Sequence, residues 1–160
     1  MVAINLEEIQ ARDNRLYSRI LLSRVRDLML DIREIELAPI DITPRQAYIL
    51  LILYHLGHKA TLSQLTKYNE RQASTISVQM TKMEKAGLVR KVRKTTKSTL
   101  LIFELTKKGL DTYYKSEKQT SEKVIMSALS EKERLQFIES LKKILSKAAK
   151  YHKTLLEAES

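Results

Sequence analysis

The sequence predicts a mainly α-helical protein that carries one two-stranded β-hairpin, and three observations lead to this class. The 160 residues include three glycines and two prolines, fewer turn residues than a mostly β protein needs. Apolar residues recur at helical spacing over most of the chain. The exception is one segment in which two β-rich runs, residues 88–93 and 100–105, flank a polar tip.

Capping boxes mark the expected helix starts. In this pattern a Ser, Thr, Asn or Asp is followed three residues later by Glu or Gln, and each side chain satisfies a backbone N–H that the helix leaves without a partner. Apolar periodicity follows each match and supports it. Five pairs fit: Asn5/Glu8, Thr43/Gln46, Thr61/Gln64, Asn69/Gln72 and Ser130/Glu133.

The first expected helix runs from about Leu6 to about Leu37. At this length it would extend roughly 45 Å, which is long for a small domain and suggests a second chain to pack against. A connector follows, and then a largely buried helix from about Pro44 to Leu56. Gly57 suits the position just beyond that helix.

Two shorter helices, about 62–68 and 70–86, precede the hairpin, and Gly87 closes the second of them. Two long helices, about 106–129 and from Ser130 onward, complete the chain. The order helix, short helix, helix, hairpin over residues 43–108 is the layout of a winged helix-turn-helix. We therefore expect residues 43–108 to form a DNA-binding region within a single 160-residue chain.

The distribution of charge supports this interpretation. The chain has 29 basic and 19 acidic residues and a net charge of +10. Residues 1–58 carry a net charge of −1, residues 59–108 carry +9 and residues 109–160 carry +2. Five cations lie on the hairpin: Arg90, Lys91, Arg93, Lys94 and Lys97. Such a cluster is suited to phosphate contact; the alternative is a solvated basic loop.

The second helix of the pair would read bases in the major groove. Its spacing predicts that Ala73, Ile76, Met80 and Met83 face the core. Five residues fall on the opposite side: Arg71, Ser74, Thr75, Val78 and Lys82, with Gln79 at the margin. Arginine can bond guanine, hydroxyls can donate or accept, and valine can contact a thymine methyl. We expect Lys82 to contact the DNA backbone; the alternative is an ordinary solvated helix face.

Other kinds of site find little support. With no cysteine there can be no disulfide and no thiolate metal site. His55 and His58 are spaced for one helix face, but Gly57 is expected to end the helix between them, so we expect no metal and no cofactor. No catalytic motif is present, and we expect no enzyme. The longest apolar run is too short to span a bilayer, which indicates a soluble, cytoplasmic protein.

Four segments resemble the multiple-antibiotic-resistance regulator (MarR) family. They are residues 42–47 (ITPRQA), 73–77 (ASTIS), 83–89 (MEKAGLV) and 105–109 (LTKKG), and their order and spacing match the family over essentially the whole chain. The resemblance implies a homodimer, with residues 1–37 and 109–160 as the dimerisation region. It also implies a transcription regulator, typically a repressor, and many such proteins release DNA when a small phenolic or other anionic ligand binds.

Four tyrosines, Tyr17, Tyr48, Tyr113 and Tyr114, are candidates to line such a ligand cleft; the alternative is that they belong to the core or to an interface. The wing departs from the family pattern, which has an Asp eight positions before the Leu-Thr pair and an Arg two residues later. Lys97 and Thr99 occupy these positions. Lysine lacks the planar fork of arginine, so we expect this wing to hold phosphate through Lys94 and Lys97 more than to read the minor groove.

The sequence thus predicts a homodimeric, sequence-specific regulator that binds double-stranded DNA at an inverted repeat, with half-sites about one helical turn apart. Two other functions stay open. One is an adaptor that binds proteins through its long helices, and the other is a protein that coats DNA without sequence preference.

Overall fold

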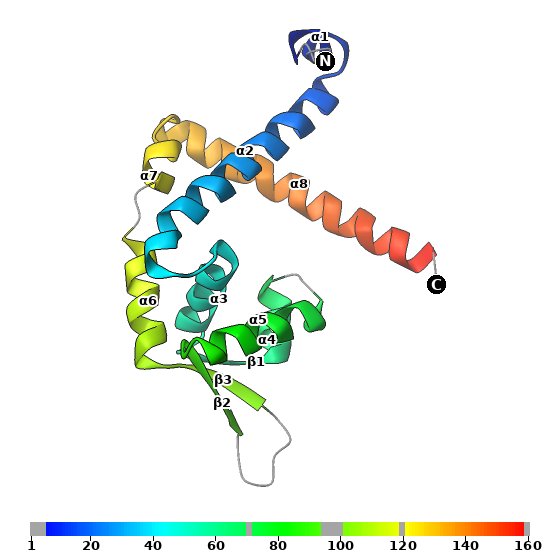
Figure 1. Ribbon diagram of the computed structural model, residues 1–160. Helices are drawn as coiled ribbons and strands as arrows, with labels where there is room; N and C mark the ends of the chain where they lie inside the picture. Colours follow the sequence, from blue (N-terminus) through cyan, green and yellow to red (C-terminus); the bar gives the residue numbers. More distant parts are fainter. Residues whose placement is uncertain (1–5, 70–71, 94–100, 119–120, 159–160) are drawn as a thin grey trace, which may run out of the picture. The chain divides into compact units, whose positions relative to one another are not determined.

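The computed structural model describes residues 6–69, 72–93, 101–118 and 121–158 (Figure 1). The chain divides into two compact units between residues 119 and 120. The first unit contains α1 (Leu6–Arg12), α2 (Asn14–Leu37), the 3₁₀ turn η1 (Ala38–Ile40), α3 (Pro44–His55), β1 (Lys59–Thr61), α4 (Leu62–Asn69), α5 (Ala73–Lys85), β2 (Val89–Arg93), β3 (Leu101–Leu105) and α6 (Lys107–Glu117). The second contains α7 (Ser121–Met126) and α8 (Glu131–Ala158).

Three of the five predicted capping boxes are confirmed. In the first, the Thr43 N–H donates to Gln46 Oε1 at 2.8 Å and the Gln46 N–H donates to Thr43 Oγ1 at 3.2 Å. The pairs Thr61/Gln64 and Ser130/Glu133 make the same reciprocal bonds. The Asn5/Glu8 pair includes a residue outside the described ranges.

The box at Asn69 and Gln72 is wrong. Asn69 is the last residue of α4, and its side-chain amide donates to the Leu65 carbonyl at 3.0 Å. Gln72 is the N-cap of α5, without a side-chain cap bond, so α5 begins at Ala73. Ala73 is consequently exposed rather than in the core, because it starts the helix ahead of the first inward-facing turn. The other three predicted core positions, Ile76, Met80 and Met83, are fully buried.

Both helices predicted to flank the winged region as continuous rods are interrupted. Asp13 separates α1 from α2 and caps α2, accepting from the N–H groups of Arg15 and Leu16 at 2.8 and 3.3 Å. These hydrogen bonds lower the Asp13 pKa below its ordinary value. After the hairpin, α6 ends at Glu117 and a separate helix α7 follows. Periodicity alone did not reveal either break, since apolar residues continue on both sides.

The sheet has one strand more than predicted. The described strands form an antiparallel sheet in the order β1-β3-β2. The predicted hairpin partners β2 and β3 pair in register from Val89 with Leu105 to Arg93 with Leu101. On the other side of β3 lies β1, with Ala60 opposite Phe103. β1 has three residues, too few to show a strand period in the sequence.

The core of the first unit lies between the sheet and the helices α3, α4 and α5 (Figure 1). Leu50 and Leu53 of α3, Leu65 of α4 and Met80 of α5 have no exposed surface, and Phe103 of β3 is 4% exposed. Burial of this many branched and aromatic side chains is the main stabilising term of such a domain. The helix-turn-helix and the sheet are therefore joined through one apolar centre.

Gly57 and Gly87 end their helices in the same way, as predicted. Gly57 has φ +76° and Gly87 has φ +72°, a left-handed conformation that glycine adopts without strain. At the exit of α5, the Leu88 N–H donates to the Met83 carbonyl and the Gly87 N–H donates to that of Glu84. This pattern is a Schellman motif, and it turns the chain directly from α5 into β2.

Candidate nucleic-acid interface

The predicted base-reading face of α5 points away from the core. Ile76, Met80 and Met83 are fully buried and fix the rotation of the helix about its axis. On the other side, Ser74 and Lys82 are exposed, whereas Thr75 and Gln79 are partly buried. Arg71 lies outside the described residues. The helix therefore offers hydroxyl, apolar and cationic groups on one free face.

Val78 is the least expected residue on this face. Its side chain is 55% exposed, although valine has a low helix propensity and gains nothing from water. A serine or a charged residue would serve a purely solvated surface better. An exposed methyl pair among hydroxyls is suited to contact with a thymine methyl group.

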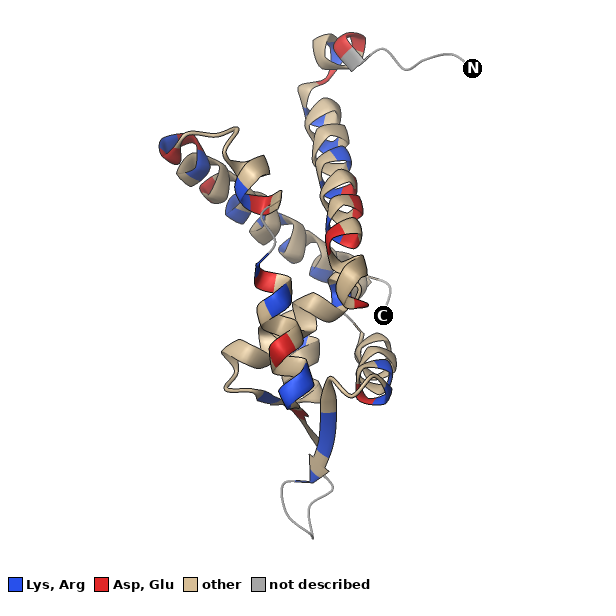
Figure 2. Ribbon diagram, turned by 60° about the vertical axis from the view of Figure 1, so that its left-hand side comes forward, with Lys and Arg blue, Asp and Glu red and all other residues tan. Residues whose placement is uncertain are grey.

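The cations of β2 differ in how far they are neutralised within the protein. Arg90 pairs with Glu104 of β3 at 2.9 Å. Lys91 pairs with Glu84 of α5 at 2.7 Å, so it links the wing to the recognition helix. Arg93 is exposed and has no acidic partner among the residues that the structure describes. Figure 2 shows this concentration of basic residues along β2.

The predicted wing residues Lys94 and Lys97 lie outside the described ranges. Of the three predicted wing cations that the structure describes, Arg93 is the one without an acidic partner among the described residues. The two paired cations join β2 to β3 and to α5, through Glu104 and Glu84 respectively. Such exposed pairs contribute modestly to stability.

The start of α6 holds the exit of α5 in place. The Thr106 hydroxyl, which caps α6 by accepting from the Gly109 N–H, lies 2.6 Å from the Gly87 carbonyl oxygen and 3.2 Å from that of Leu88. The Lys108 ammonium donates to the Ala86 carbonyl at 2.8 Å. Three successive carbonyls at the end of the recognition helix thus receive partners from one turn of α6.

Gly109 is required at this junction because there is no room for a side chain. A Cβ atom at this position would overlap the backbone carbonyl of Leu88 and press on the Leu105 side chain. The α6 backbone consequently packs directly against the turn between α5 and β2. Sequence reasoning identified the segment 105–109 by resemblance only, and its physical role is this contact.

The structure brings two of the four ligand-candidate tyrosines together. Tyr113 is 6% exposed and stacks on Tyr54 of α3 with ring centroids 4.3 Å apart. Tyr114 meets Tyr54 edge-on at 5.7 Å. Burial raises the pKa of Tyr113, and a hydrogen bond with Tyr54 raises that of Tyr114. Sequence reasoning missed Tyr54, since one aromatic residue inside an apolar run carries no separate signal.

The other candidate tyrosines lie elsewhere on the helices. Tyr48 of α3 is about half exposed, and its hydroxyl donates to the Tyr68 carbonyl at 3.4 Å. Tyr17 is partly buried on α2. The rings of His55 and His58 both flank Tyr54. Within the described residues, no three His, Asp or Glu side chains gather as metal ligands would.

Comparison with known proteins shows which family this segment of the chain resembles. The model of the MarR family matches residues 40–96, from the end of η1 into the wing. No curated protein matches the sequence. The resemblance to the MarR family that the motifs indicated is confirmed for this segment, which contains the helix-turn-helix.

Several solved structures are similar over most of the chain. The organohalide-sensing transcriptional regulator RdhR-CbdbA1625 in its 2,4-dichlorophenol-bound form has a TM-score of 0.78 at 21% identity, covering 89% of this chain and 84% of that one. AbsC, a MarR-family regulator from Streptomyces coelicolor, has 0.77 at 22%, covering 93% and 99%. The S. aureus MepR–DNA complex has 0.74 at 24%, covering 81% and 96%. The predicted fold, a mainly α winged helix-turn-helix with long terminal helices, is thereby confirmed.

In the part of the chain that the structure describes, no helix is both long and apolar enough to cross a bilayer.

Proposed function

We propose that this chain, whose helix-turn-helix segment matches the MarR family, is a sequence-specific transcription regulator that binds double-stranded DNA as a homodimer. The observation that carries the proposal is the free face of α5, where exposed Ser74, Val78 and Lys82 lie opposite three fully buried residues. A helix held this firmly by its core can enter the major groove without rearranging. The proposed readers of bases are Arg71, Ser74, Thr75, Val78 and Gln79.

The electrostatics of the neighbouring wing support contact with the DNA backbone. Arg93 and Lys82 are exposed cations on β2 and α5, the two elements that meet at the α5 exit. Phosphate contacts position a protein on the duplex, whereas contacts with base edges specify the sequence. We assign Lys82 and the wing cations to the first task. Because Arg90 and Lys91 are already paired, we expect them to contribute less than Arg93.

The long helices support the homodimer. On α2, Leu28 and Ile35 are 62% and 74% exposed, and on α8, Leu145 is 58% exposed. Apolar surface repeated along helices of this length is typical of a protein-protein interface. A symmetric pair of winged segments would favour an inverted repeat with half-sites about one helical turn apart.

Two similar proteins support DNA binding and a response to a ligand. MepR has been solved as a complex with DNA, and RdhR-CbdbA1625 in a form with bound 2,4-dichlorophenol. By this analogy we propose that the present chain is a repressor that a small molecule releases from its operator. Tyr17, Tyr48, Tyr113 and Tyr114 remain candidates for lining a ligand site, with Tyr54 added by its stacking on Tyr113.

The experiment is a salt series of binding to DNA from upstream of the protein's own gene and to a random duplex of equal length. A regulator should prefer the upstream DNA by a factor of about 10³ or more. A steep salt dependence without preference would indicate a coating protein. Absence of binding to both duplexes would indicate an adaptor and overturn the proposal.

Two variants of α5 separate base reading from backbone contact. Val78→Ala should lower affinity for the preferred DNA by about tenfold and leave random DNA unaffected, because it removes an apolar contact with a base. Lys82→Met is the matched control on the same face and should weaken both duplexes equally. Equal weakening by Val78→Ala would contradict its assignment.

The wing lysines are tested in the same assay. Replacing Lys94 and Lys97 with alanine should weaken binding to all duplexes about equally and reduce the salt dependence, since each lysine would neutralise a phosphate. A loss confined to sites flanked by A/T pairs would instead indicate that the wing reads minor-groove shape.

A further inference from the structure

The most basic part of the chain keeps few acids, and those that the structure describes lie on cations of β2. Residues 59–108 contain twelve basic residues and three acids: Glu70, Glu84 and Glu104. The first of these lies outside the described ranges. Glu84 pairs with Lys91 at 2.7 Å, and Glu104 pairs with Arg90 at 2.9 Å. A carboxylate beside a surface that contacts phosphate repels the phosphate, so both acids need an explanation.

The pair of Glu104 with Arg90 is explained by the sheet. The two residues lie directly opposite each other in the register of β2 with β3, and opposite charges in such a cross-strand pair stabilise the sheet. Glu84 has no such explanation. It lies in the last turn of α5, where the unpaired carbonyls of the helix disfavour a negative charge.

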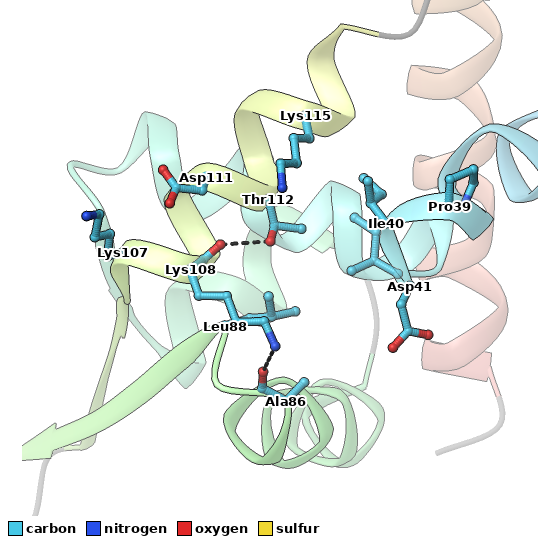
Figure 3. A pocket seen from close by; sticks show the side chains of 11 residues that line it. Pro39, Ile40, Asp41, Ala86, Leu88, Lys107, Lys108, Asp111, Thr112 and Lys115 are labelled. Carbon is cyan, nitrogen blue, oxygen red and sulfur yellow. Dashed lines mark hydrogen bonds between the residues drawn. The ribbon is translucent and has the colours of Figure 1, made fainter.

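The end of α5 already receives a cation from another element. The Lys108 ammonium of α6 donates to the carbonyl of Ala86, the C-cap residue of α5, at 2.8 Å (Figure 3). A neutral residue at position 84 would therefore leave the helix end with its partner and would remove an unfavourable charge. The role of Glu84 has to come from its pair with Lys91.

Lys91 lies on the same face of the sheet as the free cation of the wing. Side chains alternate along a strand, so Val89, Lys91 and Arg93 share the face on which Val89 and Phe103 are buried. The Lys91 ammonium lies 6.0 Å from the centre of the Phe103 ring. Arg93 is exposed, and its surroundings in the described part of the chain hold no acid within ion-pair distance. The bond to Glu84 is what distinguishes Lys91 from Arg93.

We propose that Glu84 is a specificity-determining residue: it withholds Lys91 from DNA phosphates and so weakens binding that does not depend on sequence. This inference rests on the proposed function. On random DNA, affinity comes from electrostatic contacts, and a released lysine meets a phosphate in any register. On the preferred DNA, base contacts of α5 fix the register, so a released Lys91 gains less. The pair thus increases the preference for the correct sequence.

The pair can compete with a phosphate because of where it lies. The side chains of Lys91 and Glu84 are 34% and 35% exposed, and salt screens a partly buried pair less than an exposed one. Transfer of Lys91 to a phosphate would also leave the Glu84 carboxylate unpaired, beside both the helix carbonyls and the DNA. This cost opposes the transfer.

The test is a salt series of Glu84→Gln binding to the preferred and the random duplex. Glutamine keeps the size of the side chain and removes the charge. Affinity for random DNA should rise about fivefold, and the slope of log affinity against log salt should steepen by about 0.9, the value for one additional phosphate contact. The preferred duplex should gain about twofold, so the preference falls.

Two control variants identify the released group. Glu139→Gln removes the same charge from α8 and frees Lys142 from a 2.8 Å pair, and it should leave both affinities unchanged. The double variant Glu84→Gln/Lys91→Met should return to the salt slope of the original chain, because the released cation is gone. No gain on random DNA, an equal gain on both duplexes, the same gain in Glu139→Gln, or a gain that persists in the double variant would each overturn the proposal.

A heparin column separates this inference from the proposed function, because heparin is a polyanion without a base sequence. Glu84→Gln should elute at higher salt than the original chain and the double variant. If the original chain shows no preferred DNA, the proposed function fails, while the elution order still decides whether Glu84 withholds Lys91. If all three elute together and the original chain prefers its upstream DNA, the inference fails and the proposed function stands.

Discussion

The winged segment and the long helices use their apolar residues in opposite ways. In α3, α4 and α5, residues such as Leu50, Leu65 and Met80 have no exposed surface. In α2, by contrast, Leu37 is the one buried residue, and α8 buries none of its described side chains. Both regions have helical periodicity, so the pattern of apolar residues does not distinguish them.

This difference indicates which part of the molecule is complete in a single chain. The winged segment has its own core, two confirmed capping boxes, two helices that end at a glycine, and a recognition helix whose rotation is fixed by that core. The long helices present apolar stripes that water disfavours. The contrast agrees with the proposed homodimer, in which each chain would supply one DNA-binding surface and the long helices of two chains would set the spacing between these surfaces.

The largest effect should come from a cavity in the winged core. Leu50→Ala should lower the free energy of unfolding by about 3 kcal/mol, because a fully buried leucine is lost from a packed interior. Urea denaturation at two protein concentrations measures this. If α3 is complete within one chain, the loss will be the same at both concentrations; a loss that depends on concentration would erase the contrast between the two regions.

A slightly smaller effect is expected at the α5 exit. Gly109→Ala should cost about 2 kcal/mol, because the added methyl meets the Leu88 carbonyl and the turn must move. Gly57→Ala is the control. It strains a left-handed residue but meets no atom within 4 Å, so about 1 kcal/mol is expected. Thermal melts compare the loss of stability in the two variants. A larger loss for Gly57→Ala would show that the close approach to Leu88 is not what constrains Gly109.

Substitutions in the exposed apolar stripe of α8 should change the association of two chains rather than the stability of the fold. Leu145→Ala should raise the dissociation constant of the dimer about tenfold, because a leucine that the interface would cover is shortened. Lys143→Ala, about 160° away around the helix, should leave it unchanged. Analytical ultracentrifugation measures both, and identical behaviour of the two variants would argue against an interface on this stripe.

A substitution of Arg33 tests the contact between α2 and α6. Its guanidinium donates to the Ser116 carbonyl at 3.1 Å and pairs with Glu36 at 3.4 Å, and both side chains are less than one-fifth exposed. Arg33→Met should cost about 1 kcal/mol in chemical denaturation. Arg26→Met, which removes an exposed pair with Asp27, should cost less. If the two costs are equal, the link between α2 and α6 adds nothing beyond a surface pair.

The smallest effect concerns pH. Hydrogen bonds from Ser130 lower the Glu133 pKa below its ordinary value of 4.5. A lowered folded-state pKa contributes stability above the ordinary value, and this contribution is lost as the pH falls through the lowered pKa. Melting curves below pH 5 should therefore show a shallower decline for Glu133→Gln than for the original chain. An unchanged slope would mean that the cap does not favour the ionised form.

Many features of the fold could be predicted because their causes are local. The boxes at Thr43, Thr61 and Ser130 and the glycines at 57 and 87 act within a few residues of chain. The buried face of α5 follows from spacing alone, apart from Ala73. The interruption at Asp13 is also local, but Asp is common on helix surfaces and apolar residues continue across it.

For the candidate interface, the sequence by itself determined the winged helix-turn-helix, the segment that holds the excess positive charge and the outward face of the recognition helix. These follow from period and composition, which depend on neighbours along the chain. Tertiary structure alone decided the pairing of β1 with β3, the ion pairs that neutralise Arg90 and Lys91, the stacking of Tyr54 on Tyr113, and the hold of Lys108 on Ala86. Each of these joins residues of different helices or strands, and such contacts depend on how the elements pack rather than on any local pattern.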